Sequence, residues 1–468
     1  MKTKPNTLGE LVQSGYVVRS VKDELEANLL KVLAAGEELF PGIQGYEETV
    51  VPQVVNAILA HHDMVLIGEK GQAKSRVMRA LTRFLDPEIP VVEGCPINDN
   101  PFDPICFRCR KLKEEKGDSL PVAWLPREKR YNERLSPGTK LADLIGDLDP
   151  AKVAGGSPLS SEDALHFGLI PRTNRGIFGI NELPDLEYLV QVGLFNILEE
   201  KDVQIRGFPF RFPLDVVLIF TANPEDYTRA GKIISQLKDR IGAEIRTHYP
   251  ADRETGIKIM EQEALRITDS ELRIEIPEFM KEIVEQITME ARNSPFVNKK
   301  SGVSARLSIA NYETLVSNAR RRAVLLGEEQ AVPRICDLNY LLASTAGKVE
   351  LDPFREETVT EVKVLAKIFE KAVLTVFKER VPAKDLDAWA SEIKGGVAAE
   401  VSDMMPASDF KKVIAKFPQL WEPVEQLSAG KSDGYKASCL EFVLEGLHLS
   451  GKLSRKRIGG LASYAAAK

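Results

Sequence analysis

The feature that most constrains the fold is a loop-like segment with the sequence Gly68-Glu69-Lys70-Gly71-Gln72-Ala73-Lys74-Ser75. It follows a short apolar run at residues 64–67 that predicts a buried strand, and it opens a helical pattern at 75–84. A strand, a glycine-containing loop and a helix in this order are the setting of a P-loop, whose backbone N–H groups and helix N-terminus bind phosphates. The segment therefore predicts an α/β domain that binds a nucleotide.

The loop residues have distinct predicted roles in binding ATP and Mg²⁺. Lys74 is expected to reach the β- and γ-phosphates, and Ser75 to supply a hydroxyl group to Mg²⁺. Gly68 and Gly71 stand at the places with the most demanding backbone, whereas Ala73 replaces the glycine of the usual pattern. This replacement costs little if the φ angle of Ala73 is negative.

Two further apolar runs end in polar residues, which supports the nucleotide-binding prediction. The run at 177–180 leads to Asn181 and Glu182, and the run at 216–220 leads to Asn223. We expect Asn181 on the Mg²⁺ side, Glu182 to activate water, and Asn223 to bond the γ-phosphate or that water. Asn181 is neutral and is a weaker Mg²⁺ partner than aspartate. Slow ATP hydrolysis, or ATP binding with little hydrolysis, is therefore an alternative. Arg240 follows a short helix and suits a finger that reaches into a neighbouring subunit.

The order of strand and helix patterns predicts the domain organisation. Strands alternate with helices up to residue 250, with a β-hairpin at 203–213 and a fourth strand at 244–249, which favours a doubly wound parallel sheet. Beyond Pro250 only helices are expected, and the basic residues near 452–457 are expected at a solvated helix end. The predicted parts are an N-terminal helical segment (1–38), a nucleotide-binding α/β domain (39–250), a helical lid (251–350) and a C-terminal helical domain without an assigned role (351–468).

Residues 39–350 resemble AAA+ ATPases of the branch that holds the MoxR-type ATPases and the magnesium chelatase I subunit. The resemblance lies in the entry segment 40–45, in the Gly-x-x-Gly-x-Ala-Lys-Ser loop, and in the turn at 146–149. The run Pro171-Arg172-Thr173-Asn174-Arg175-Gly176-Ile177 is similar to the chelatase sequence before Walker B. The hairpin at 203–213 stands where the branch has its pre-sensor-1 hairpin.

The resemblance implies further roles and partners. Asn223 matches sensor 1, Arg240 the arginine finger, and Arg306 in Ser304-Ala305-Arg306 the sensor 2 arginine. Asn181 departs from the family's Walker B aspartate. Members form homo-oligomeric rings, commonly hexamers, with ATP at subunit interfaces, so Arg240 would act on a neighbour's nucleotide. They work with a partner that carries a von Willebrand factor A domain, and they remodel that partner or insert a metal ion into a client.

Several functions are consistent with these motifs. We expect first an ATP-hydrolysing AAA+ motor that remodels a protein partner or assists metal insertion. The alternatives are a magnesium chelatase-type subunit for tetrapyrrole metallation and an ATP-binding scaffold with little hydrolysis. An enhancer-binding transcription activator is disfavoured because the Gly-Ala-Phe-Thr-Gly-Ala loop is missing. A DNA motor is disfavoured by the net charge of −6, and we expect no nucleic-acid partner.

Three of the five cysteines lie together in the segment 87–127, which is expected to be an irregular insertion. Cys95, Cys106 and Cys109 form a Cys-x10-Cys-x2-Cys pattern, and the last pair has a spacing suited to Zn²⁺. Because no fourth cysteine or histidine lies nearby in sequence, reduced thiols are favoured, while Zn²⁺, an Fe–S centre or a redox-active pair stay open. Cys336 and Cys439 lie in helical patterns and are expected in a core.

The sequence also predicts a compartment. The N-terminus is polar, no signal peptide is recognised, and no uncharged apolar run reaches the roughly 18 residues of a membrane span. Five cysteines in 468 residues do not suggest a disulfide scaffold. We therefore expect a cytoplasmic protein without a membrane span.

Overall fold

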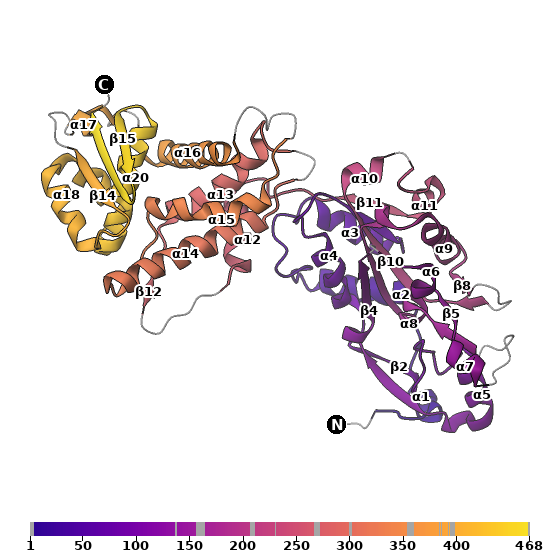
Figure 1. The fold of residues 1–468 in the computed structure, drawn as a ribbon. Helices are drawn as coiled ribbons and strands as arrows, with labels where there is room; N and C mark the ends of the chain where they lie inside the picture. Colours follow the sequence, from indigo (N-terminus) through magenta and orange to yellow (C-terminus); the bar gives the residue numbers. More distant parts are fainter. Residues whose placement is uncertain are drawn as a thin grey trace. The chain divides into compact units, whose positions relative to one another are not determined.

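The computed structural model divides the chain into two compact units, Met1–His248 and Tyr249–Lys468 (Figure 1). The structure describes residues 4–135, 138–155, 164–205, 211–229, 231–265, 272–298, 302–352, 360–382, 384, 386–391, 393 and 398–466. Among these residues, no helix is long and apolar enough to cross a membrane.

A five-stranded parallel sheet forms the centre of the first unit, with the strand order β11-β1-β10-β7-β4. The strands are β1 Met64–Ile67, β4 Tyr131–Leu135, β7 Gly176–Asn181, β10 Val216–Ala222 and β11 Ala243–Arg246. Every residue of β1, β7 and β10 is buried, because helices cover both faces of a parallel sheet. The predicted doubly wound parallel sheet is confirmed.

Alternate residues of each central strand contribute to two separate cores. Met64 and Leu66 pack in the core that contains residues of α2, α3 and α4, whereas Val65 and Ile67 pack in the core that contains residues of α9 and α11. These helices are α2 Val21–Ala34, α3 Val50–Leu59, α4 Lys74–Ala80, α9 Tyr188–Glu199 and α11 Ser235–Arg240. The first unit is therefore a three-layer α/β/α structure, as the helices on either side of the sheet in Figure 1 show.

Two parts of the first unit differ from the expectations. Strand β4 was not predicted, because it is an edge strand with polar residues such as Asn132 and Glu133. The segment 87–127 is not irregular: β2 Glu88–Val92 pairs antiparallel with β3 Val122–Pro126, and α5 Phe107–Lys116 lies between them in sequence. Prolines at positions 90 and 126 obscured these strands, since proline is accepted mainly in edge strands such as these.

The remaining elements of the first unit are short. The expected hairpin at 203–213 is present as the antiparallel pair β8 and β9, although residues 206–210 lie outside the described part of the chain. Strands β5 and β6 form a second antiparallel pair. These elements are α1 Leu8–Gln13, α6 Leu141–Leu144, β5 Gly146–Leu148, α7 Pro150–Ala154, β6 Leu165–Phe167, α8 Leu169–Arg172, β8 Asp202–Gln204, β9 Arg211–Pro213 and α10 Pro224–Thr228.

The second unit is mainly helical, as expected. Its helices are α12 Arg253–Glu263, α13 Glu278–Asn293, α14 Arg306–Leu326, α15 Leu342–Thr345, α16 Glu361–Arg380, α17 Leu386–Ser391, α18 Phe410–Lys416, α19 Trp421–Ser428 and α20 Asp433–Leu449. A large apolar core extends from Ile257 in α12 to Tyr464 in β16. The predicted lid (251–350) and C-terminal domain (351–468) therefore share one core.

The second unit also contains strands, which corrects the expectation of helices alone after residue 250. Strands β14 Ala399–Ser402, β15 Leu453–Ile458 and β16 Leu461–Ala466 form an antiparallel sheet, and β12 Arg273–Ile274 pairs with β13 Gln330–Ala331. The basic residues near 452–457 lie largely in β15 and not at a helix end. A turn at Gly459-Gly460, with a φ of 60° at Gly459, joins β15 to β16, and this dipeptide was the available hairpin signal.

A buried ion pair connects the N-terminal helices to the edge of the sheet. Arg130 precedes β4 and donates to both carboxylate oxygens of Glu24 in α2, at 2.7 and 2.6 Å. Its Nε atom donates to the carbonyl oxygen of Arg175 at 2.8 Å. Both side chains are almost fully buried, so each charge depends on the other.

We predict that Glu24→Ala lowers the free energy of unfolding by about 3–5 kcal/mol, because it leaves the Arg130 guanidinium buried without its counter-charge. Chemical denaturation measures this loss. Glu26→Ala, in the same helix, is the matched control: Glu26 pairs with the partly exposed His61, and we expect a loss of at most about 1 kcal/mol. Equal losses in the two variants would contradict the role given to the buried pair.

Candidate functional site

The loop Gly68–Ala73 connects β1 to α4, as the sequence predicts for a P-loop. A Cβ atom at Gly68 would lie 1.8 Å from Thr247 Oγ1, so no side chain fits there. Gly71 has a φ of 79°, which glycine adopts without strain. Ala73 has a φ of 52° and lies in the left-handed region. The condition for a low cost, a negative φ at Ala73, is therefore not met, and its Cβ makes this backbone strained.

Gln72 of the predicted loop and two side chains that the sequence did not indicate, Tyr46 and Thr247, hold the loop in place. Gln72 Oε1 accepts hydrogen bonds from the Glu69 N–H at 3.0 Å and from Thr247 Oγ1 at 2.8 Å. The Tyr46 hydroxyl lies 2.8 Å from the carbonyl oxygen of Gln72. Burial raises the pKa of Tyr46 to about 12, so its hydroxyl stays protonated. Tyr46 and Thr247 stand 201 residues apart, and only the fold brings them together.

Lys74 is buried at the start of α4, with its ammonium group turned toward the loop. Its Nζ atom donates to the carbonyl oxygens of Gly68 and Glu69, the latter at 2.8 Å. Burial lowers the pKa of Lys74 to about 8, and the charges of Glu182 and Glu69 oppose this shift. The two carbonyl oxygens are neutral partners. A phosphate placed at this loop would supply a negative counter-charge to the buried ammonium group.

The Mg²⁺ side of the site contains a carboxylate that the sequence did not indicate. Ser75 Oγ donates to Asn181 Oδ1 at 2.9 Å, and Asn181 Nδ2 lies 3.4 Å from Glu133 Oε1. Glu133 belongs to the unpredicted strand β4 and pairs with Arg79 at 2.6 Å. The hydrogen bond from Arg79 is the main cause that lowers the pKa of Glu133. A negative charge is therefore present next to the neutral Asn181.

Glu182 and Asn223 meet at the ends of the adjacent strands β7 and β10. Asn223 Nδ2 donates to Glu182 Oε2 at 3.1 Å, and the Glu182 N–H donates to Thr221 Oγ1 at 3.1 Å. Asn223 Oδ1 is buried without a hydrogen-bond partner among the described residues. Glu182 has a φ of 56°, the kind of strained backbone that gathers at functional sites. Burial raises the pKa of Glu182, opposed by the charge of Lys74.

The two predicted arginines lie on other elements. Arg240 ends α11 and forms an ion pair with Glu199 of α9 at 2.5 Å, and its guanidinium stacks 5.3 Å from the centroid of the Phe195 ring. Arg306 is exposed at the first position of α14 in the second unit. The arginine-finger role of Arg240 and the sensor 2 role of Arg306 stay predictions.

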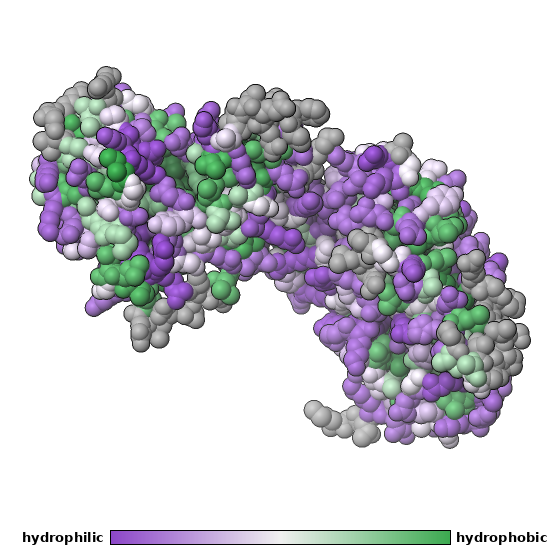
Figure 2. Space-filling view, viewed as in Figure 1, coloured by the Kyte–Doolittle hydropathy of each residue, from purple (hydrophilic) through white to green (hydrophobic). Residues whose placement is uncertain are grey.

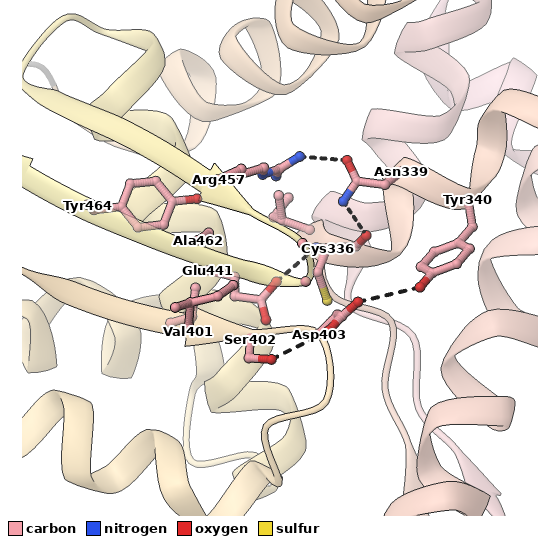
Figure 3. Close-up of a pocket in the computed structure, with 14 residues that line it drawn as sticks. Cys336, Asn339, Tyr340, Val401, Ser402, Asp403, Glu441, Arg457, Ala462 and Tyr464 are labelled. Carbon is pink, nitrogen blue, oxygen red and sulfur yellow. Dashed lines mark hydrogen bonds between the residues drawn. The ribbon is translucent and has the colours of Figure 1, made fainter.

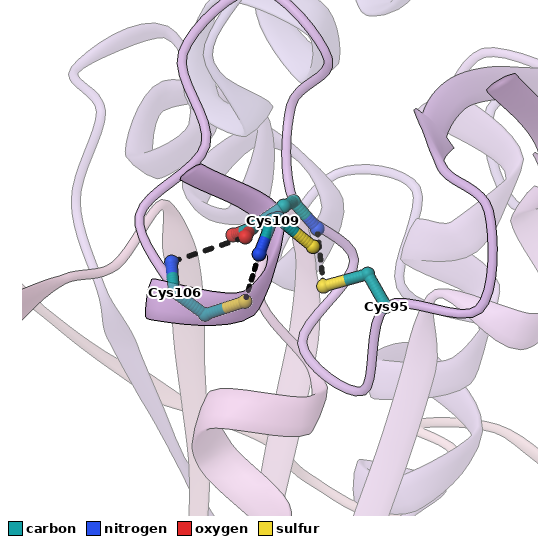
Figure 4. Close-up of side chains that lie close together, drawn as sticks. Cys95, Cys106 and Cys109 are labelled. Atoms are coloured by element: carbon teal, nitrogen blue, oxygen red, sulfur yellow. Dashed lines mark hydrogen bonds between the residues drawn. The ribbon is translucent and has the colours of Figure 1, made fainter. Parts of the chain in front are cut away.

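Cys95, Cys106 and Cys109 do lie together, and a fourth residue joins them. Cys106 caps α5 and Cys109 lies in its first turn, while Cys95 lies in the loop that follows β2 (Figure 4). Asp99 adds a carboxylate, and the four ligand atoms lie within 4.8 Å of one another. The sequence did not indicate Asp99 as a fourth ligand, because only cysteine and histidine were considered and Asp99 looks like an ordinary loop residue.

A separate cavity of about 360 Å³ lies in the second unit (Figure 3). Strands β14, β15 and β16 and the segment 335–340 surround it, and Glu441 of α20 faces it. Glu441 is buried, its Oε2 atom accepts from the Cys336 N–H at 2.9 Å, and Arg457 Nη1 donates to Asn339 Oδ1 at 2.6 Å. The lining combines these polar groups with apolar side chains such as Val401 and Leu461.

The surface of the first unit carries exposed apolar residues on α9. Tyr188 and Leu189 are each about two thirds exposed. Figure 2 shows hydrophobic surface at the place of this helix in Figure 1, next to mostly hydrophilic residues. Helix α9 also carries Glu199, which forms an ion pair with Arg240, the predicted arginine finger. The exposed apolar side chains and this ion pair therefore belong to one helix.

Comparison with known proteins identifies magnesium-chelatase proteins among the relatives of this chain. The chain is 34% identical over 211 residues to a magnesium-chelatase subunit ChlI homologue of Methanocaldococcus jannaschii, which covers 43% of this chain and 53% of the relative. It is 29% identical over 321 residues to the chloroplastic subunit ChlI-2 of Arabidopsis thaliana, covering 66% of this chain and 72% of the relative. No protein-family model matches the chain.

A solved structure described as a complex between subunits BchI and BchD of magnesium chelatase aligns at 23% identity and a TM-score of 0.36, over 68% of this chain and 98% of that chain. The relationship itself rests on the sequence relatives. The resemblance to the AAA+ branch of the magnesium chelatase I subunit is confirmed, whereas none of these relatives is a MoxR-type ATPase. The matched region spans about half the length of the archaeal relative.

We predict that Ala73→Gly stabilises the protein by about 0.5–1 kcal/mol. The left-handed conformation of alanine costs roughly 1–2 kcal/mol, and the added chain entropy of glycine offsets part of this gain. Ala80→Gly is the control, because Ala80 has an ordinary helical φ of −64° and glycine there should destabilise by about 0.5–1 kcal/mol. Thermal unfolding of both variants measures the difference, and a loss of stability in Ala73→Gly would refute the strain at this position.

We predict that nucleotide affinity falls as the pH rises above about 8, because Lys74 then loses its charge in the free protein. A bound phosphate raises the pKa of Lys74, so affinity should fall by up to about tenfold per pH unit above that point. Titration with a fluorescent ATP analogue between about pH 7 and pH 9.5 measures the slope. Lys74→Arg keeps its charge over this range and should show no such slope. A flat profile for the unmodified chain would contradict this role.

Proposed function

We propose that this chain is an ATP-hydrolysing AAA+ motor subunit of the magnesium chelatase I type. The observation that carries the proposal is the hydrogen bond between Asn223 and Glu182 at 3.1 Å, formed where the site also holds the buried Lys74. A carboxylate, an amide and an ammonium group at the carboxyl ends of β7, β10 and β1 are the groups that phosphoryl transfer to water requires.

The residues of the site divide the chemical work. Glu182 would orient and polarise the attacking water, and Asn223 would hold the carboxylate in position through its amide nitrogen. The free Oδ1 atom of Asn223 can accept a hydrogen bond from that water. Lys74 would stabilise the charge that builds on the phosphate oxygens. Arg240, supplied by a neighbouring subunit, would add a second positive charge.

Ser75, Asn181 and Glu133 would hold Mg²⁺ and its water molecules. When bound, Mg²⁺ neutralises charge on the β- and γ-phosphates. Asn181 supplies a neutral oxygen, and the neighbouring Glu133 carboxylate supplies the negative charge that an aspartate at position 181 would bring. This arrangement favours hydrolysis over an ATP-binding scaffold that hydrolyses little ATP.

The named relatives favour metal insertion over the remodelling of a protein partner. One sequence relative is a magnesium-chelatase subunit and the other is described as a homologue of one, so we propose that ATP turnover assists the insertion of a metal ion, with a tetrapyrrole as the client class.

We further propose a homo-oligomeric ring, with six subunits as the family resemblance implies, and a partner with a von Willebrand factor A domain. The exposed apolar residues of α9, which also carries the partner of Arg240 in the Arg240–Glu199 ion pair, support an interface at this helix. The cytoplasmic location stays a prediction.

Steady-state ATP hydrolysis in the presence of Mg²⁺ tests the proposal. We expect Glu182→Gln to lose about 10²-fold or more of its turnover while it still binds ATP, because the amide cannot act as a base. Glu128→Gln is the control, since Glu128 is an exposed residue whose carboxylate pairs only with the surface Arg127 among the described residues.

The outcomes separate the candidate functions. Turnover that is lost in Glu182→Gln and kept in Glu128→Gln supports a working motor. Equal turnover in all three proteins would rule out Glu182 as the base. Tight ATP binding without turnover in the unmodified chain, both alone and with a chelatase-type partner added, would favour the scaffold.

A further inference from the structure

We propose that Cys95, Asp99, Cys106 and Cys109 form a tetrahedral Zn²⁺ site that fixes the segment between β2 and β3. The four side chains come from the loop after β2 and from the start of α5 (Figure 4). None of these four residues has a role in the proposed ATP chemistry. The Zn²⁺ site can therefore be tested independently of the proposed function.

The spacing of the ligand atoms fits one metal ion. The three sulfur atoms and a carboxylate oxygen all lie within 4.8 Å of one another. A tetrahedral Zn²⁺ with Zn–S bonds of about 2.3 Å requires sulfur atoms about 3.8 Å apart. The side chains therefore reach the required geometry by shifts of about 1 Å or less.

Asp99 provides the independent sign of a missing cation. Its side chain is fully buried, and its Oδ1 atom has no hydrogen-bond partner among the described residues. The other oxygen, Oδ2, accepts the Cys106 N–H at 3.1 Å. A buried carboxylate with an unpaired oxygen is costly unless it is paired with a cation or binds a metal. Beside three sulfur atoms, a metal ion satisfies this requirement.

The surroundings of the sulfur atoms favour thiolate ligands. Backbone N–H groups of Ile97 and Asp99 point to Cys95 Sγ at 3.4 and 3.3 Å. The Cys109 N–H points to Cys106 Sγ at 3.4 Å, at the N-terminus of α5. Such hydrogen bonds stabilise a negatively charged sulfur. Cys106 and Cys109 are buried, so ready exchange with external thiols is not expected.

The donor set selects the metal. Fe–S clusters are usually held by four cysteine thiolates, and this cluster offers three thiolates and one carboxylate. Zn²⁺ accepts both sulfur and carboxylate oxygen in a tetrahedral arrangement. A site with four protein ligands is closed to substrate, so we assign it a structural role.

The local fold explains why a metal is needed here. Among the described residues, the apolar cluster of this segment has six buried members, with partly buried residues such as Phe102 and Leu112 packed against them: Leu8, Val92, Ile97, Cys106, Cys109 and Leu120. A core of this size contributes little folding free energy without a metal or disulfide. Among the described cysteines, all five are free thiols, so a metal is the available constraint.

The segment also supports the strands that carry Glu182 and Asn223. Asn98 Nδ2 donates to the carbonyl oxygen of Arg172 at 2.8 Å. Asn174 Nδ2 donates to the carbonyl oxygen of Ile97 at 3.1 Å, and its Oδ1 accepts the Asp215 N–H at 3.0 Å. Asn174 stands two positions before β7, and Asp215 stands one position before β10. A metal bound by Cys95 and Asp99 would therefore fix the loop that contacts the residues before both strands.

Metal analysis of the full chain, purified under reducing conditions without chelators, tests the site. We expect about one zinc ion per chain in the unmodified protein and less than about a tenth of that in Cys109→Ser. Cys336→Ser is the matched control, because Cys336 lies in the second unit, and it should keep its zinc. Asp99→Asn should bind zinc at least about 10- to 100-fold more weakly in competition with a chelator dye.

A spectroscopic measurement covers the case in which Cys109→Ser does not fold. Co²⁺ added to the metal-free unmodified chain should give thiolate-to-cobalt charge-transfer bands and the visible absorption of a tetrahedral ion. Zinc in the unmodified protein together with these spectra supports the proposal. Three freely titrating thiols without metal, a disulfide within the cluster, or bound iron and sulfide would each overturn it, whatever the ATPase activity.

Discussion

The parallel hydrogen bonding of β1 with β10, and of β10 with β7, determines where the polar groups of the candidate site lie. Parallel strands end at the same edge of a sheet, so residues that follow three separate apolar runs become neighbours. Lys74, Glu182 and Asn223 meet for this reason, although 149 residues separate the first from the last. The two apolar cores on either side hold the strands in register, and the site depends on both.

The site is built on backbone conformations that its residue types disfavour. Ala73 and Glu182 both have a positive φ, a strained conformation of the kind that gathers at functional sites. The surrounding contacts impose these conformations: Gln72 and Thr247 fix the loop, and Thr221 fixes the Glu182 N–H. Buried charge adds to this cost, because Lys74 keeps its ammonium group away from water. A phosphate bound at the loop would supply a negative counter-charge to this ammonium group.

The sequence predicted the centre of the fold better than its edges. Buried parallel strands such as β1 and β10 are continuous apolar runs, and they were found to within two residues. Strand β4 is a polar edge strand without such a pattern, so Glu133 and its place beside Asn181 were missed. Asp99 was missed because only the turn between Cys95 and α5 shows that its carboxylate points to the cysteines. The φ of Ala73 depends on the loop as a whole, and a residue type alone does not determine it.

The continuous core of the second unit has a mechanical consequence. Residues of α13 in the predicted lid and of α16 and α20 in the C-terminal region pack into one apolar core, with β15 and β16 at its far end. Close-packed interiors transmit displacement with little compression. A displacement of α13 would therefore move α16, α20 and the three-stranded sheet with it as one body.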